Sequence, residues 1–237
     1  MTLVDLVHTC FKKWLANEAE GFANFKEDKY SVPNNQWASN KSKSDYCWTT
    51  LNAVLKTEAN DQMRFGMALD KCLRENSQNL DKEYFVGCEM PLRFLSLIGN
   101  PDEPHKSPTV DLCIYEKPPA LWLSREIPSQ RCSSEAEDYL RAIIEVKLIS
   151  WSAPLSKWKN KREYDRGIGK DLRVFEAAHR KWKDMPLFYL ILDESYLNPF
   201  WQPSIGMSSK CKALDNYFKV LRANCAAKNV HILSNRP

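Results

Sequence analysis

Three charged residues, Asp111, Glu145 and Lys147, stand inside short apolar segments and are the residues best suited to chemistry. Asp111 lies in PTVDLCIYE (108–116), and the other two lie in AIIEVKLIS (142–150). A charged group is costly to bury unless it is paired or binds a metal ion. Two neighbouring carboxylates favour a hard divalent cation such as Mg²⁺. With a lysine beside them, they suit metal-assisted hydrolysis of a phosphodiester.

Both segments alternate as β-strands do, and this alternation decides which side chains share a face. We expect the apolar positions to face the core, and the three charged side chains to meet on the reverse face. The apolar set is Val110, Leu112 and Ile114 in the first strand, and Ile144, Val146 and Leu148 in the second. The Val146 carbonyl is expected to point between the two acidic side chains as a further ligand. The alternative is a salt bridge of Lys147 with Glu145 or Asp111 on an exposed sheet face.

Hydrophobic periodicity predicts the elements that position these strands. We expect helices over 3–19, 47–75 (with a break near Asn60-Asp61), 170–183 and 210–227. We expect strands over 84–95, 109–115, 140–149, 187–193 and 230–233. The order predicts an α/β (α+β) fold in a single domain, 1–237. Within it we expect an N-terminal helix and loop over 1–46, a core over 47–193, and a C-terminal helix-strand extension over 194–237.

Asp111 followed by Glu145-Val146-Lys147, in this order of elements, resembles the PD-(D/E)xK nuclease superfamily. The resemblance implies the restriction-endonuclease-like fold, an α-β-β-β-α-β core whose mixed central sheet is flanked by helices. It also implies Asp111 as the metal-bridging carboxylate, Glu145 and the Val146 carbonyl as further ligands of Mg²⁺ or Mn²⁺, and Lys147 as the catalytic lysine. The chain departs from the family in two ways, since the proline-aspartate dipeptide is absent and the gap from Asp111 to Glu145 is long, which indicates an insertion.

Many members of the superfamily add an acidic residue from the first core helix or strand. Glu58, on the expected helix 47–75, and Glu89, in the expected strand 84–95, are the two candidates here. For either residue the alternative is an ordinary solvated carboxylate.

Positive charge gathers directly after the second strand. Residues 151–183 carry ten basic and four acidic residues, a net +6, which leaves the rest of the chain at −2 because the whole is +4. Basic residues among tryptophans and a tyrosine suit phosphate contacts with base stacking. The predicted nucleic-acid contacts are Lys157, Lys159, Lys161, Arg162, Arg166, Lys170 and Arg173. The alternative is a solvated helix face and loop.

Composition and motifs exclude other classes. In 237 residues, 43% hydrophobic and 27% charged residues exclude a disordered, collagen-like or membrane chain. No secretory leader is recognised, and no apolar run approaches the length of a bilayer span. The eight cysteines form no CxxC pair, so we expect reduced thiols in the cytoplasm rather than a disulfide framework. Nucleophile-elbow, P-loop and dinucleotide motifs are absent.

The resulting hypothesis is a Mg²⁺-dependent nuclease acting on nucleic acid, with DNA favoured over RNA, in a defence, mobile-element or repair setting. The family usually leaves a 5′-phosphate and a 3′-hydroxyl. One alternative is a catalytically inactive protein of the same fold that binds nucleic acid or a protein partner. Another is an unrelated α/β interaction protein. A homodimer is a further expectation from the family, because many members cut both strands as dimers. The sequence does not distinguish endonuclease from exonuclease, or the specificity of cutting.

Overall fold

The fold is built on a five-stranded mixed sheet with the strand order β1-β2-β3-β4-β5. The computed structural model describes residues 1–27, 58–76, 82–91, 109–116, 138–149, 168–193 and 208–236. The strands are β1 (Phe85–Pro91), β2 (Thr109–Tyr115), β3 (Leu140–Ile149), β4 (Leu187–Asp193) and β5 (Val230–Ser234). The first three pair antiparallel, and β3, β4 and β5 run parallel.

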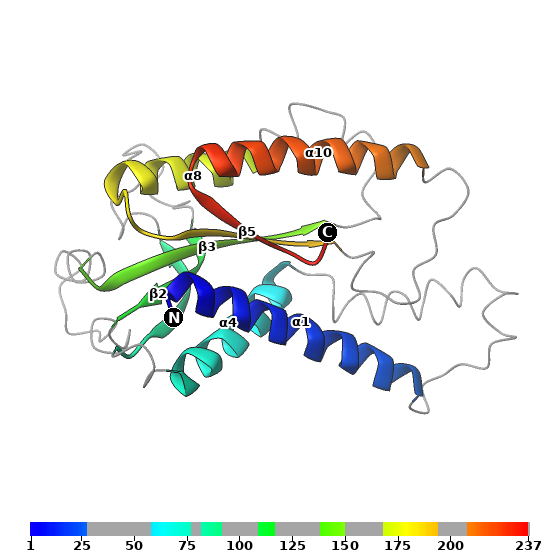
Figure 1. Cartoon of the computed structure of the whole chain (residues 1–237), viewed down its shortest axis with the longest axis horizontal. Coiled ribbons are helices and arrows are strands. Elements are labelled where there is room, and N and C mark those ends of the chain that lie inside the picture. Colours follow the sequence, from blue (N-terminus) through cyan, green and yellow to red (C-terminus); the bar gives the residue numbers. More distant parts are fainter. Residues whose placement is uncertain are drawn as a thin grey trace, which may run out of the picture.

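Helices cover both faces of this sheet (Figure 1). Helices α1 (Leu3–Glu27) and α4 (Glu58–Glu75) lie on one side, and α8 (Ile168–Lys181) and α10 (Ser208–Ala227) lie on the other. Each side has its own hydrophobic cluster, with Phe65 and Leu69 among the α4 residues in one and Phe175 and Leu221 from α8 and α10 in the other. Strand β4 is buried at every position because it is covered on both faces, which explains its continuous apolar run.

Local signals in the sequence begin and end these elements. At the start of α1, the Thr2 hydroxyl accepts the Asp5 N–H at 3.1 Å and the Asp5 carboxylate accepts the Thr2 N–H at 3.0 Å. This reciprocal cap satisfies N–H groups that a helix start leaves without partners. After α10, Asn229 adopts a φ of 55°, a left-handed conformation that asparagine tolerates and that turns the chain into β5.

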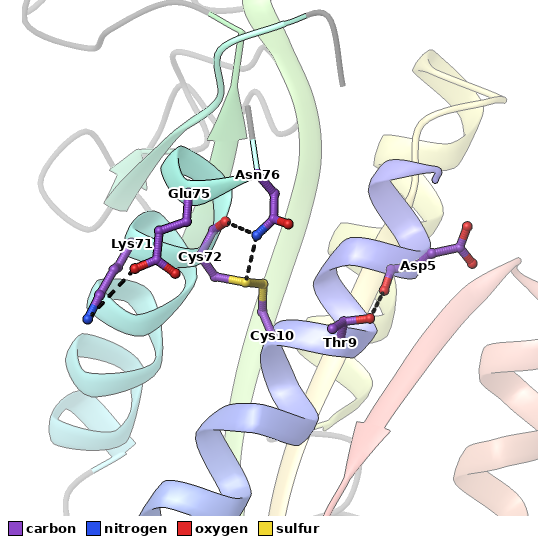
Figure 2. The surroundings of a disulfide bond; sticks show 7 residues. All are labelled: Asp5, Thr9, Cys10, Lys71, Cys72, Glu75 and Asn76. Atoms are coloured by element: carbon purple, nitrogen blue, oxygen red, sulfur yellow. Dashed lines mark hydrogen bonds and ion pairs between the residues drawn. A yellow bond between two sulfur atoms is a disulfide. The ribbon is translucent and has the colours of Figure 1, made fainter. Parts of the chain in front are cut away.

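A disulfide bond between Cys10 and Cys72 joins α1 to α4 (Figure 2). Both cysteines are buried, and the Asn76 side chain donates to the Cys72 carbonyl at 2.8 Å. The expectation of reduced thiols is therefore wrong for this pair, because periodicity assigns each cysteine to a helix face but does not show that the two faces meet. Cys113 and Cys225 are buried free thiols, and Cys88 lies exposed.

Most expected elements are confirmed, with shifts at their ends. The order helix, strand, strand, strand, helix, strand appears as α4-β1-β2-β3-α8-β4, followed by α10 and β5. Helix α4 continues through Asn60 and Asp61, so the expected break there is wrong. Helix α1 extends to Glu27, whereas β1 ends at Pro91, a residue that cannot donate to a ladder. Residues 47–57 and 92–95 of the expected elements lie outside the described ranges.

The expectation of one core face and one reverse face is also wrong, because helices bury both faces of β2 and β3. Val110 packs in the α8/α10 cluster, whereas Leu112 and Ile114 pack in the α1/α4 cluster. Simple alternation therefore fails between Val110 and Leu112, at Asp111. Within the described residues, no helix is long and apolar enough to cross a membrane.

Candidate metal and active site at an interruption of the sheet

Asp111 lies where the pairing of β2 with β3 ends. The antiparallel pairs of this ladder reach Leu112↔Ile144 and end there. One residue further along β2, the Asp111 carboxylate oxygen Oδ2 accepts the N–H of Val146 at 2.7 Å. A side-chain carboxylate therefore occupies the place that a backbone carbonyl of β2 would hold in a regular ladder.

The pairing of β1 with β2 keeps one register on both sides of Asp111, from Phe85↔Tyr115 to Pro91↔Thr109. A buried backbone carbonyl needs a hydrogen-bond partner, either from the ladder or from a side chain. For Asp111 that partner is the side chain of Gln62, whose Nε2 donates to the Asp111 carbonyl at 2.7 Å.

The direction of the Val146 backbone brings its carbonyl to this point. Ile143 donates its N–H to Pro186, at the start of β4, so the odd-numbered residues of β3 point their backbone groups toward β4. Val146 then points toward β2, because neighbouring residues of a strand alternate and the N–H and C=O of one residue share a side. The Val146 carbonyl is therefore on the β2 side of β3, the side on which the Asp111 carboxylate accepts the Val146 N–H, and its role as a metal ligand stays a prediction.

Glu145 directly precedes Val146 in β3, and it is 5% exposed. The pKa of the Cys113 thiol is raised first by burial and then by the charges of Glu145 and Asp111 among others, so both carboxylates act on the same buried group. Lys147 is half-buried two residues along the same strand, paired with Ile191 of β4. The structure thus joins Asp111 to Val146 and places Glu145 and Lys147 directly before and after Val146 in β3.

Sequence reasoning missed a tyrosine and an aspartate on the β4 side of Glu145. Tyr189 pairs with Glu145 in the parallel ladder, and its hydroxyl donates to Asp171 Oδ2 at 2.7 Å. Burial raises the pKa of Tyr189 well above its usual value, and Asp171 raises it further. The signal available was a tyrosine within an otherwise apolar strand. The contact fixes the first turn of α8 over the sheet at the level of Glu145.

Gln62 was missed as well, although Glu58 on the same helix was a candidate. Gln62 is 5% exposed and Asp61 is 4% exposed, so α4 carries two buried polar residues. Glu58 begins α4 one helical turn before Gln62, and residues four apart lie on the same side of a helix. A buried amide cannot be told from a solvated one in a sequence of mixed polar residues, which is why this contact was not predicted.

The side chains of Glu58 and Glu89 lie outside the described part of the structure. The backbone of Glu89 stands in β1 between Cys88 and Met90, at the register position opposite Asp111. Residues directly opposite each other in an antiparallel pair lie on the same face. Glu89 is therefore at the register position from which a third carboxylate would join the other two.

The donor set suits Mg²⁺ in its chemistry. Two carboxylates and a backbone carbonyl are hard oxygen ligands, and Mg²⁺ is usually held by one or two carboxylates with water and phosphate completing its shell. Among the described side chains, no group of three or more histidines, cysteines, aspartates or glutamates could hold a metal ion. The residues present fit a cation held by Asp111, Glu145 and the Val146 carbonyl, and do not form an all-protein cage.

The predicted nucleic-acid contacts divide between described and undescribed residues. Arg173 lies exposed on α8, and Lys170 lies in the first turn of this helix, where only its backbone is described. Lys157, Lys159, Lys161, Arg162 and Arg166 lie outside the described ranges. Arg173 is two residues from Asp171, so one of the predicted contacts stands at the end of α8 that approaches Glu145.

No protein-family model, curated protein or solved structure matches this chain. The site is accordingly defined by its own geometry: two carboxylates, a backbone carbonyl and a lysine at an interruption of the sheet.

Proposed function

We propose that the chain is a Mg²⁺-dependent nuclease of the PD-(D/E)xK type, with a restriction-endonuclease-like core, that hydrolyses phosphodiester bonds. The observation that carries the proposal is the hydrogen bond from Val146 N–H to Asp111 Oδ2 at 2.7 Å, which ties the Asp111 strand to the Glu145-Val146-Lys147 strand. The order α4-β1-β2-β3-α8-β4 supports it, because this is the order that the resemblance implies.

Each residue has a task in this proposal. Asp111, Glu145 and the Val146 carbonyl would hold the cation, which when bound would polarise the scissile phosphate and lower the pKa of a water. Lys147 holds the attacking water and offsets the negative charge that develops on the phosphoryl oxygens. Tyr189 and Asp171 fix the start of α8 beside Glu145. Arg173, exposed on the same helix, binds a backbone phosphate of the substrate.

The decisive experiment measures cutting of single- and double-stranded DNA and RNA with Mg²⁺, with Mn²⁺ and with EDTA. The variants are Glu145→Gln and Lys147→Met, and the matched control is Arg141→Met, which changes a basic residue of the same strand that pairs with Glu116. Metal-dependent cutting that is lost in both site variants and kept in the control supports the proposal. Cutting that survives in Glu145→Gln contradicts it.

A second candidate function is a protein of the same fold that binds nucleic acid without cutting it. It is supported by Arg173, which lies exposed on α8 and would contact a phosphate without a cation. Binding of DNA that is indifferent to Mg²⁺, together with the absence of cutting, would decide for this alternative.

We also propose DNA as the preferred substrate, because the basic residues 151–183 suit phosphate contacts, and a second copy of the chain as a partner. A cytoplasmic location remains a prediction. The Cys10–Cys72 bond weighs against it, because disulfides are more typical of oxidising compartments.

A further inference from the structure

Gln62 is a buried polar residue on the apolar side of α4. Its helix neighbours on that side, Phe65 and Leu69, are fully buried and pack against the sheet. Glutamine is rarely buried, and a buried amide needs hydrogen-bond partners. Gln62 uses its Nε2 to donate to the carbonyl of Asp111 at 2.7 Å, a contact between residues 49 positions apart in the sequence.

Gly66 lets α4 come close enough to the sheet for this bond. A Cβ atom at Gly66 would lie 3.0 Å from Cδ2 of Leu112, which follows Asp111 in β2. Leu112 is fully buried, so its side chain has little room to move away. Gln62 and Gly66 are four residues apart and lie on one side of the helix. Gly66, although it destabilises a helix, therefore lies against Leu112, the residue that follows Asp111 in β2.

Asp111 is consequently held at two points. Its carbonyl accepts the Gln62 amide, and its carboxylate accepts the Val146 N–H. Neither bond is a backbone–backbone bond of the sheet, because the first uses the Gln62 side chain and the second uses the Asp111 side chain. The orientation of the Asp111 carboxylate then depends on α4 as well as on the sheet.

We propose that Gln62 is a positioning residue, which acts through the Asp111 carbonyl to hold the Asp111 carboxylate against Val146 in the geometry that binds the cation. The claim that Gln62 supports cation binding rests on the proposed function. The claim that the Asp111–Val146 contact depends on Gln62 is structural and is independent of the proposed function.

The first test measures hydrogen exchange of the Val146 amide by NMR in Gln62→Met, which keeps the length of the side chain and removes its donor. The loss of one hydrogen bond of ordinary strength corresponds to exchange faster by about tenfold at Val146. The Leu190 amide in β4 should keep its wild-type exchange rate. A uniform increase at both amides would indicate general destabilisation and would overturn the proposal, as would an unchanged rate at Val146.

A second variant, Gly66→Ala, tests the same link without removing the amide. Alanine favours a helix over glycine, which offsets part of the cost of moving α4 away from the buried Leu112. We expect faster exchange at Val146 with wild-type exchange at Leu190. The matched control is Met67→Ala, since Met67 is 68% exposed on the same helix. If Gln62→Met does not fold, Gly66→Ala alone decides, and wild-type exchange at Val146 would overturn the proposal.

The metal-binding part is measured by titrating each protein with Mn²⁺ alone and recording the EPR signal of the free ion. We expect Gln62→Met to bind Mn²⁺ about tenfold more weakly than the wild type, by the same hydrogen-bond energy. Equal affinity in the two proteins would overturn the inference and leave the nuclease proposal intact. A wild type that binds no Mn²⁺ would contradict the proposed function, and the exchange of Val146 would still decide on the link through Gln62.

Discussion

The carboxylates near the two ends of β2 have opposite surroundings. At the C-terminal end, the Glu116 carboxylate forms ion pairs with Lys82, at 3.0 Å, and with Arg141. At the other end, the Asp111 carboxylate accepts the backbone N–H of Val146, the residue after the buried Glu145. Near Glu116 the β2–β3 register shifts between Ile114 and Tyr115, and the Glu116 N–H donates to the Tyr139 carbonyl, whereas near Asp111 the pairs of this ladder end at Leu112↔Ile144.

The contacts of Glu116 stabilise the fold, whereas Asp111 belongs to the site that we propose. A charge pair at a strand end is a modest structural contact. A buried carboxylate such as Glu145 is costly to place in a sheet, and proteins accept such local costs mainly at functional sites. The Asp111 end is therefore where we expect substitution to change activity, and the Glu116 end is where we expect it to change stability slightly.

The largest expected effect is on cutting by Asp111→Asn. The amide oxygen still accepts the Val146 N–H, but the charge that holds the cation is lost. We expect the rate of metal-dependent cutting to fall by about 10³-fold, or about 4 kcal/mol in activation free energy, with an unchanged or higher melting temperature. Glu116→Gln is the matched change at the other end and should leave cutting within about twofold of the wild type. Equal losses in the two variants would remove the distinction between the two ends.

The next largest effect is on stability, at a buried carboxylate whose charge is balanced by an arginine. Asp193 at the end of β4 is 0% exposed, and its carboxylate forms an ion pair with Arg236 at 3.0 Å. The Asn235 side chain hydrogen-bonds to the backbone N–H and carbonyl of Asp193. Arg236→Ala leaves the Asp193 charge buried without this cation, so we expect the free energy of unfolding to fall by about 3–5 kcal/mol in urea denaturation. Lys82→Ala at the exposed Glu116 pair should cost less than about 1 kcal/mol. Similar losses of stability in Arg236→Ala and Lys82→Ala would show that burial does not make the Asp193 ion pair more important than the Glu116 ion pair.

A somewhat smaller effect is expected from the disulfide that holds α4, the helix of Gln62, against α1. Cys10 and Cys72 close a loop with a sequence separation of 62, and removing a disulfide of this kind typically costs about 2–4 kcal/mol. The double variant Cys10→Ala/Cys72→Ala should show this loss in thermal or urea unfolding without reductant. The control is Cys88→Ala, which removes an exposed cysteine and should leave stability nearly unchanged. A stable double variant would show that packing alone holds the two helices together.

The smallest expected effect lies away from both ends of β2, where His8 of α1 meets His231 of β5 at 6.1 Å between ring centroids. Burial lowers the pKa of both imidazoles below 6.5, and His231 lowers the pKa of His8 further. As the pH falls below 6.5 the unfolded chain takes up protons first, so the free energy of unfolding decreases until the folded imidazoles are protonated.

This loss should be visible in urea unfolding between about pH 6.5 and 5, and smaller in His8→Phe. Titration of Glu116 does not contribute to this pH dependence between pH 6.5 and 5, because Lys82 first and Arg141 next lower the pKa of Glu116 below its usual value of 4.5. An unchanged pH dependence in His8→Phe would contradict the assignment to the histidine pair.

The sequence predicted the strands of the site well and its surroundings poorly. The bounds of β2, β3 and β4 match the expectations, because apolar alternation and a continuous apolar run are strong local signals. The contact of Asp111 with Val146 joins the two strands that the sequence singled out, and the use of these residues as a metal site stays a prediction. Gln62 and the disulfide could not be predicted in the same way, because each depends on which faces of two distant elements meet. The prediction that Val110 shares a face with Leu112 was wrong, because alternation of side chains holds only along a regular strand and the sequence does not show where the strand is irregular.

The bond between Cys10 and Cys72 turns the first third of the chain into a covalent ring. A protease that cuts once anywhere between these two residues opens the ring without releasing a fragment. The cut protein would migrate as one species of full mass under non-reducing denaturing conditions and as two pieces after reduction. The N-terminal helix thus stays attached to α4 by a bond that does not depend on the polypeptide between them.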